Sequence, residues 1–121
     1  MGQVAQPVHR KVERRVAPRF GVECWAEECF DAGVYFHRVT NLSRDGFFVE
    51  KKLPFRVGQT IRMRLDLPGF ADKPEARSRV VNNYRDKQDQ LCGAGFQFLD
   101  LDGQSRKVIE AFIRRMTLRN K

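Results

Sequence analysis

Arginines are the residues of this chain best suited to bind an anion, and the run RRVAPRF at positions 14–20 holds three of them. Arg15 and Arg19 form an R-x-x-x-R spacing, and Arg14 directly precedes the pair. A guanidinium pairs bidentately with phosphate oxygens or with a guanine edge, and it also stacks on a base. Pro18 disfavours a helix at the residue before it, so we expect an extended segment that grips separate parts of one ligand. The spacing recurs elsewhere in this basic chain, and a solvated basic tail is the alternative.

A second polar group follows in NLSRDG, where Asn41, Ser43 and Gly46 form N-x-S-x-x-G around Arg44. These residue types favour turns, so ordinary turn chemistry is one interpretation. In the other, Asn41 and Ser43 hydrogen-bond a ligand from the surface, and Gly46 allows close backbone approach or a positive φ. The motif begins 22 positions after Arg19, which is enough for one hairpin to return the chain beside its own start.

Groups for catalysis are sparse. His9 and His37 have no acid or nucleophile at a spacing typical of a catalytic site, and neither G-x-S-x-G nor a P-loop occurs. We therefore predict a binding protein and not an enzyme, with His37 partly buried and hydrogen-bonded in a strand. Cys24, Cys29 and Cys92 lack C-x-x-C spacing and lie in strand-like stretches. They are predicted to be buried thiols in a reducing cytoplasm, without a metal or a disulfide.

The positive charge lies at the two ends of the chain. The net charge is +8 over 121 residues, made up of +4 in residues 1–20, −1 in 21–103 and +5 in 104–121. A uniformly basic nucleic-acid surface would not have this distribution, although two basic ends that meet could form one anion-binding face. No apolar run approaches a membrane span and the N-terminus has no hydrophobic signal core, so we expect a soluble, cytoplasmic protein without a membrane partner.

The elements that must position these groups are mainly strands. Alternating apolar residues are clearest in IRMRLDLP, with Ile61, Met63, Leu65 and Leu67 on one face. In the first strand, Cys24 and Ala26 are expected to face inward and Trp25 and Glu27 outward. Turn formers separate six such segments, which predicts a closed or nearly closed antiparallel barrel. The expected strands cover 20–27, 34–40, 47–50, 61–68, 77–85 and 93–99.

The two ends of the chain differ from this pattern. After Asp102, a candidate N-cap, apolar residues recur at helical spacing between Val108 and Met116. This predicts an amphipathic C-terminal helix that covers a side or mouth of the barrel, with a membrane-surface helix as the alternative. Residues 1–12 are polar and aperiodic, and we expect a flexible basic N-terminal arm ahead of one domain over 13–121.

Both motifs in this order, on this strand pattern, resemble the PilZ domain, the bacterial receptor for cyclic di-GMP. The resemblance covers about residues 13–118 and includes GFFVE, LPFRVGQTIRMRLDLP and GAGFQFLDLD. Asn41 stands where many relatives have aspartate, a change that the family pattern allows. The resemblance implies a stand-alone six-stranded barrel without a cofactor. Its implied ligand site comprises Arg14, Arg15, Arg19, Asn41, Ser43, Arg44 and Gly46.

The resemblance also implies how such a receptor works. The residue before the arginine pair is associated in the family with the number of ligands, and Arg14 favours two intercalated cyclic di-GMP molecules per chain. We expect the ligand to order the arginine segment against the barrel and so to signal to an unidentified partner protein. Two alternatives remain open. One is a barrel that binds single-stranded nucleic acid, with Phe47 or Phe48 as stacking platforms and the near-neutral strands arguing against it. The other is a PilZ-like adaptor that contacts proteins without a ligand.

Overall fold

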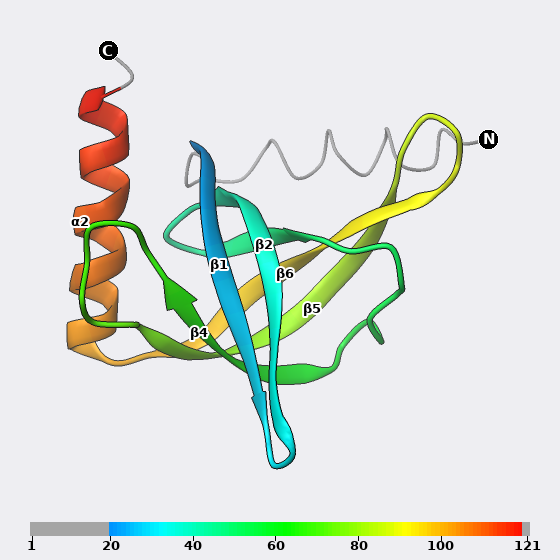
Figure 1. The fold of residues 1–121 in the computed structure, drawn as a ribbon, viewed down its shortest axis with the longest axis horizontal. Helices are drawn as coiled ribbons and strands as arrows, with labels where there is room; N and C mark the ends of the chain where they lie inside the picture. The colour runs from blue at the N-terminus through cyan, green and yellow to red at the C-terminus, as the bar shows by residue number, and fades with distance from the viewer. Residues whose placement is uncertain (1–19, 120–121) are drawn as a thin grey trace.

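A computed structural model describes residues 20–119 of the chain and shows a closed antiparallel barrel with one helix at its side (Figure 1). The barrel order is β1-β2-β3-β6-β5-β4, with β4 pairing back to β1. This confirms the predicted fold class, whereas the arm over 1–12 lies outside the described residues. The elements are β1 (Phe20–Phe30), β2 (Gly33–Leu42), β3 (Gly46–Glu50), β4 (Thr60–Asp66), β5 (Glu75–Arg85), β6 (Leu91–Leu101) and α2 (Gly103–Arg119).

Alternation along the strands fills the barrel interior. In β4, Ile61, Met63 and Leu65 are buried as predicted, because every second side chain of a strand points to the same face. The rings of Phe47 and Phe96 stack in the core with centroids 5.0 Å apart. β1 extends beyond the predicted 20–27, since its pairing with β2 continues as far as the tight turn at residues 31 and 32.

Helix α2 closes the side of the barrel next to β1 and β6 (Figure 1). The Ser105 amide donates to Asp102 Oδ1 at 2.7 Å, which confirms the predicted N-cap and lowers the pKa of Asp102. Ile109 and Phe112 are almost fully buried against the core. The predicted amphipathic helix is therefore packed on the barrel through its apolar face. No helix among the described residues is long and apolar enough to cross a membrane.

The cysteines do not all match the prediction of buried thiols. Cys24 is buried, but Cys29 and Cys92 are only half-buried, because they lie where β1 and β6 extend toward their solvent-exposed ends. All three thiols are free. Burial, with a smaller contribution from Asp66, raises the pKa of Cys24 to about 12. Within the part of the chain that the structure describes, no cluster of His, Cys, Asp and Glu side chains is suited to a metal ion.

Candidate functional site

The N-x-S-x-x-G motif forms the turn between β2 and β3. The Ser43 amide donates to the Gly46 carbonyl at 2.9 Å, and the amides of Asp45 and Gly46 donate to Ser43 Oγ at 3.1 and 3.3 Å. The turn is also tied to β6, because the Phe98 amide donates to the Asp45 carbonyl at 2.8 Å. These bonds fix the backbone between Asn41 and Gly46 relative to two strands.

Gly46 occupies a position that no side chain fits. An added Cβ would lie 1.9 Å from the carbonyl oxygen of Phe96, on the neighbouring strand β6. Gly46 is not among the residues with positive φ. The glycine is therefore required by the close approach of strand β6 and not by a left-handed backbone, while a close approach to a ligand stays a prediction.

Ser43 is placed differently from the expectation that it faces a ligand from the barrel surface. Its side chain is fully buried and its hydroxyl lies within the hydrogen bonds of the turn. Asn41 is half-buried at the end of β2, and Arg44 is exposed. Of the motif side chains, Asn41 and Arg44 thus reach the surface, while Ser43 holds the turn.

The described chain enters β1 beside this turn. The Cα of Phe20 pairs with that of Leu42, and Gly21 pairs with Asn41. The hairpin from β1 to β2 therefore returns the chain beside its own start, as its length predicted. The remaining expected site residues, Arg14, Arg15 and Arg19, lie outside the described residues.

A small cavity of about 120 Å³ opens next to the turn and adds Arg106, a base of the C-terminal stretch 104–121 that the sequence did not single out. Arg44 and Arg106 line it from the turn and from the first helical turns of α2, together with Asp45, Gln97, Phe98, Leu99 and Leu101.

Arg79 lies beside the turn in the same row of the sheet, because Gly46 pairs with Gln97 and Gln97 pairs with Arg79. Its guanidinium donates to Gln97 Oε1 at 3.2 Å. The spacing of the motif could not have identified Arg79 or Arg106, since both residues are far from it in the sequence.

His37 is buried and hydrogen-bonded, as predicted, but its partner is an acid. His37 Nε2 lies 2.8 Å from Glu28 Oε1, because antiparallel pairing sets Glu28 opposite Tyr35 and diagonal to His37. The imidazole also packs edge-on against Phe55, with centroids 5.5 Å apart. The sequence spacing did not reveal this acid, and the contacts are those of a packed structural pair.

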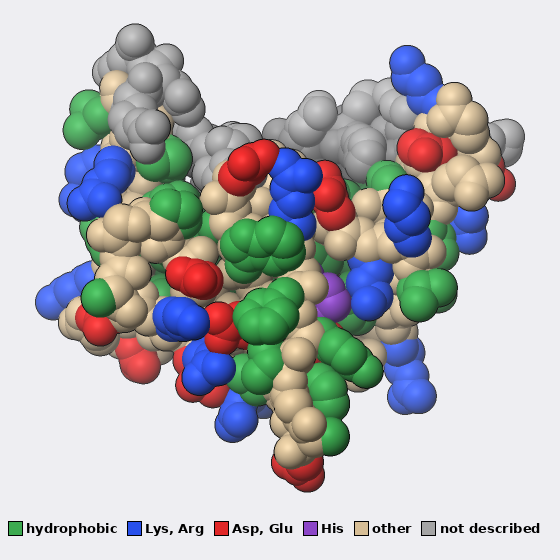
Figure 2. All heavy atoms as spheres, viewed as in Figure 1, with side chains coloured by type: hydrophobic (Ala, Val, Ile, Leu, Met, Phe, Trp, Pro, Cys, Tyr) green, Lys and Arg blue, Asp and Glu red, His purple; other side chains and the backbone are tan. Residues whose placement is uncertain are grey.

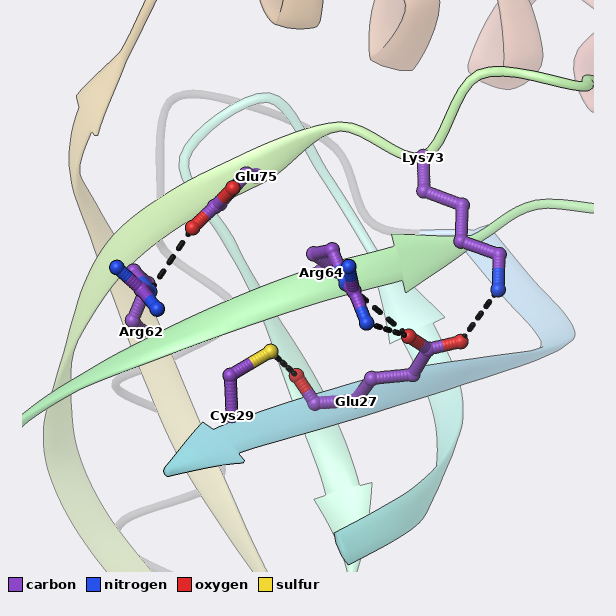
Figure 3. Close-up of polar contacts among 6 residues, drawn as sticks. All are labelled: Glu27, Cys29, Arg62, Arg64, Lys73 and Glu75. Atoms are coloured by element: carbon purple, nitrogen blue, oxygen red, sulfur yellow. Dashed lines mark hydrogen bonds and ion pairs between the residues drawn. The ribbon is translucent and has the colours of Figure 1, made fainter. Parts of the chain in front are cut away.

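An ion triplet closes the barrel at the seam between β1 and β4 (Figure 3). Arg64 donates to Glu27 Oε1 from Nε at 3.1 Å and from Nη2 at 2.9 Å, and Lys73 Nζ donates to Oε2 at 2.7 Å. Glu27 was expected to be on the solvent side, but only 4% of it is exposed because these two side chains cover it. The hydrogen bond from Lys73 is the main reason that the pKa of Glu27 is lowered, against the opposing effect of burial.

Comparisons with solved structures show the same fold in bacterial proteins. The inhibitor of motility MotI/DgrA of Bacillus subtilis is 18% identical, with a TM-score of 0.74 over 89% of this chain and 53% of that one. The K. pneumonia MrkH–c-di-GMP complex is 18% identical, with a TM-score of 0.75 over 88% and 54%. The chain thus spans about half the length of these two proteins. The PilZ domain with c-di-GMP of Escherichia coli YcgR is 13% identical, with a TM-score of 0.67 over 88% and 94%.

The family comparison rests on most of the sequence. Among curated proteins, no sequence is significantly similar to this chain. The PilZ domain, in contrast, matches residues 13–115, which include both arginine-rich and turn motifs as well as the six strands. The chain belongs to the PilZ domain family.

Proposed function

We propose that this protein is a receptor for cyclic di-GMP. Family membership supports this, since the YcgR domain and MrkH were solved with c-di-GMP. The observation that carries the proposal is the pairing of Phe20 with Leu42, beside the N-x-S-x-x-G turn. In the sequence Arg19 directly precedes Phe20, so the R-x-x-x-R segment joins the barrel at this turn. A ligand with two phosphates and two guanines matches guanidinium groups next to a fixed polar turn.

In this proposal some motif residues contact the ligand and others fix the turn. Arg15 and Arg19 grip phosphate oxygens or guanine edges, and Asn41 and Arg44 contact the ligand from the barrel. Ser43 and Gly46 contribute by fixing the turn, while a direct contact from Ser43 stays a prediction. Arg44 and Arg106 together give the adjoining cavity two guanidinium groups that suit a phosphate.

Arg14 extends the proposal to stoichiometry. Two cyclic di-GMP molecules bring four phosphate charges into one site, and Arg15 and Arg19 offset two of them directly. A third guanidinium from Arg14 stabilises a second copy. Wild-type protein should then bind two molecules per chain, and Arg14→Leu should bind one. A calorimetric titration of the wild type that saturates at one ligand per chain would remove this part of the proposal and leave the receptor function standing.

The proposed receptor acts in the cytoplasm, carries out no catalysis and signals to a partner protein. Ligand binding holds the N-terminal arginine segment against the barrel, and this ordering is the signal that the partner recognises. The alternative of a nucleic-acid-binding barrel is disfavoured by the burial of the two rings that would stack on the bases. Phe47 is fully buried, and Phe48 is half-buried against Tyr84 with ring centroids 5.6 Å apart.

Calorimetry with cyclic di-GMP, and with a short single-stranded oligonucleotide as a second titrant, tests the receptor function. Arg19→Ala and Asn41→Ala should each weaken cyclic di-GMP binding about tenfold or more, since a charged hydrogen bond contributes roughly 1.5–3 kcal/mol. Arg10→Ala, which removes a charge outside both motifs, is the matched control. Equal losses in Arg10→Ala and Asn41→Ala would favour the basic-tail interpretation. Preference for the oligonucleotide would contradict the proposal.

A further inference from the structure

Strand β2 has an open edge at the end far from the β2–β3 turn. β3 pairs with β2 only between Val39 and Leu42, so among the residues that the structure describes Gly33–Arg38 is paired with β1 alone. The chain leaves β2 after Glu50 and follows β6 instead, where the Lys51 amide donates to the Cys92 carbonyl at 3.2 Å. Backbone donors and acceptors along an unpaired strand edge form a template for another strand.

A cleft of about 640 Å³ lies along this edge. Its apolar side chains are largely exposed, with 63% of Phe36 and 69% of Leu53 open to solvent. Figure 2 shows hydrophobic side chains reaching the surface along the β1–β2 hairpin on the face in view. The cleft is lined by Phe36, His37, Glu50, Lys51, Lys52, Leu53 and Cys92.

The charges beside the cleft are unbalanced. Arg38 is shared between two carboxylates, since it pairs with Glu23 and its Nη1 also lies 3.6 Å from Glu50 Oε1. Within residues 20–119, neither Lys51 nor Lys52 forms an ion pair, and Lys51 Nζ lies 5.2 Å from the centroid of the Phe55 ring. Two ammonium groups next to exposed apolar surface are complementary to an apolar segment that carries carboxylates.

We propose that the open edge of β2 is a docking site for an extended, acidic and apolar segment of a partner protein, which adds to the sheet as a strand. Backbone hydrogen bonds to Gly33–Arg38 give affinity, while apolar side chains of the segment lie next to Phe36 and its carboxylates lie next to Lys52. A second copy of this chain is a poorer occupant, because the sequence GVYFHR at this edge offers no carboxylate to Lys51 and Lys52. The site is at the other end of β2 from the nucleotide site and does not depend on that proposal.

A pair of synthetic peptides tests the docking site. One alternates valine with glutamate, and its counterpart has lysine in place of glutamate. The acidic peptide should bind the full chain about tenfold or more tightly than the lysine peptide, and it should slow amide hydrogen exchange within residues 33–38. Equal binding of the two peptides, or binding without protection of 33–38, would overturn the proposal. A dimer seen by sedimentation without peptide, with 33–38 protected, would assign the edge to a second copy instead.

Two exposed positions supply the variants. Lys52→Glu should abolish the preference for the acidic peptide, whereas Lys87→Glu makes the same charge change in the β5–β6 turn and should leave it intact. Phe36→Ser should weaken both peptides, and Leu118→Ser, on an equally exposed position of α2, should weaken neither. If Lys52→Glu behaves like Lys87→Glu, the proposed charge recognition is wrong.

Discussion

The backbone hydrogen-bonding groups at the two ends of β2 are in opposite situations. At Leu42, the strand runs into a turn whose amides are bonded to Ser43 Oγ and whose carbonyl at Asp45 is bonded to β6. At Gly33–Arg38, no strand within residues 20–119 pairs with the edge that faces away from β1. At the closed end, few side chains can be replaced without breaking the hydrogen bonds of the turn. At the open end, the side chains are exposed and can contact other molecules. A small, rigid ligand suits the first end, and an extended chain suits the second.

Replacing Gly46 should have the largest effect, because it breaks the closed end. Gly46→Ala places a Cβ 1.9 Å from the Phe96 carbonyl oxygen, so β3 and β6 must separate or the turn must distort. We expect a loss of about 3 kcal/mol in the free energy of unfolding, measured by urea denaturation. Gly103→Ala is the matched control, since its Cβ meets nothing within 4 Å. Similar unfolding midpoints for the two variants would show that the turn is not closed as described.

The ion triplet at the seam between β1 and β4 should have the next largest effect. Glu27→Gln leaves Arg64 and Lys73 without their shared carboxylate, and we expect a loss of about 1–3 kcal/mol. Glu75→Gln removes a comparable but exposed pair, in which Glu75 Oε2 and Arg62 Nε lie 2.9 Å apart (Figure 3), and should cost less than about 1 kcal/mol. If both variants cost the same in urea denaturation, the seam is not held by Glu27.

The contribution of Glu27 should depend on pH with a defined sign. Its pKa is lowered in the folded protein from the usual 4.5, so its stabilising effect is complete above that value and is lost as the pH falls through the folded pKa. The difference in unfolding free energy between wild type and Glu27→Gln should therefore stay constant at neutral pH and shrink in acid. Denaturation series from neutral pH to about pH 3 measure this. A difference that grows in acid would contradict the ion triplet.

The smallest effect is expected at the cavity beside the closed end, and it tests whether this cavity belongs to the proposed nucleotide site. Arg106→Ala should weaken cyclic di-GMP binding by about threefold to tenfold, as expected for a partly solvated charge contact. Lys107→Ala removes the same charge from the next residue of α2, outside the cavity, and should leave binding within about twofold. If calorimetry gives the two variants equal affinities, whether both bind normally or both bind weakly, Arg106 makes no specific contact with the ligand and contributes only through the overall positive charge.

The sequence predicted elements whose pattern is local and missed features that depend on pairing. IRMRLDLP alternates strictly and became β4, and Asp102 caps the helix where the apolar period changes. The burial of Glu27 could not be predicted, because Lys73 reaches it from a distant loop. Arg106 joins the turn only through the packing of α2. The open edge was equally hidden, since periodicity does not say where β3 stops pairing with β2.

The pairing of β3 with β6 has a thermodynamic consequence. These strands are far apart in sequence, and their contact both closes the barrel and fixes the turn at Gly46. The proposed nucleotide site therefore forms only once the whole domain has folded, because a partly folded β2–β3 hairpin lacks the contact with β6. A ligand bound there stabilises the entire domain by RT ln(1 + [L]/Kd). If the protein is the cyclic di-GMP receptor proposed above, the concentration of cyclic di-GMP would then set its lifetime against proteolysis as well as its proposed signalling state.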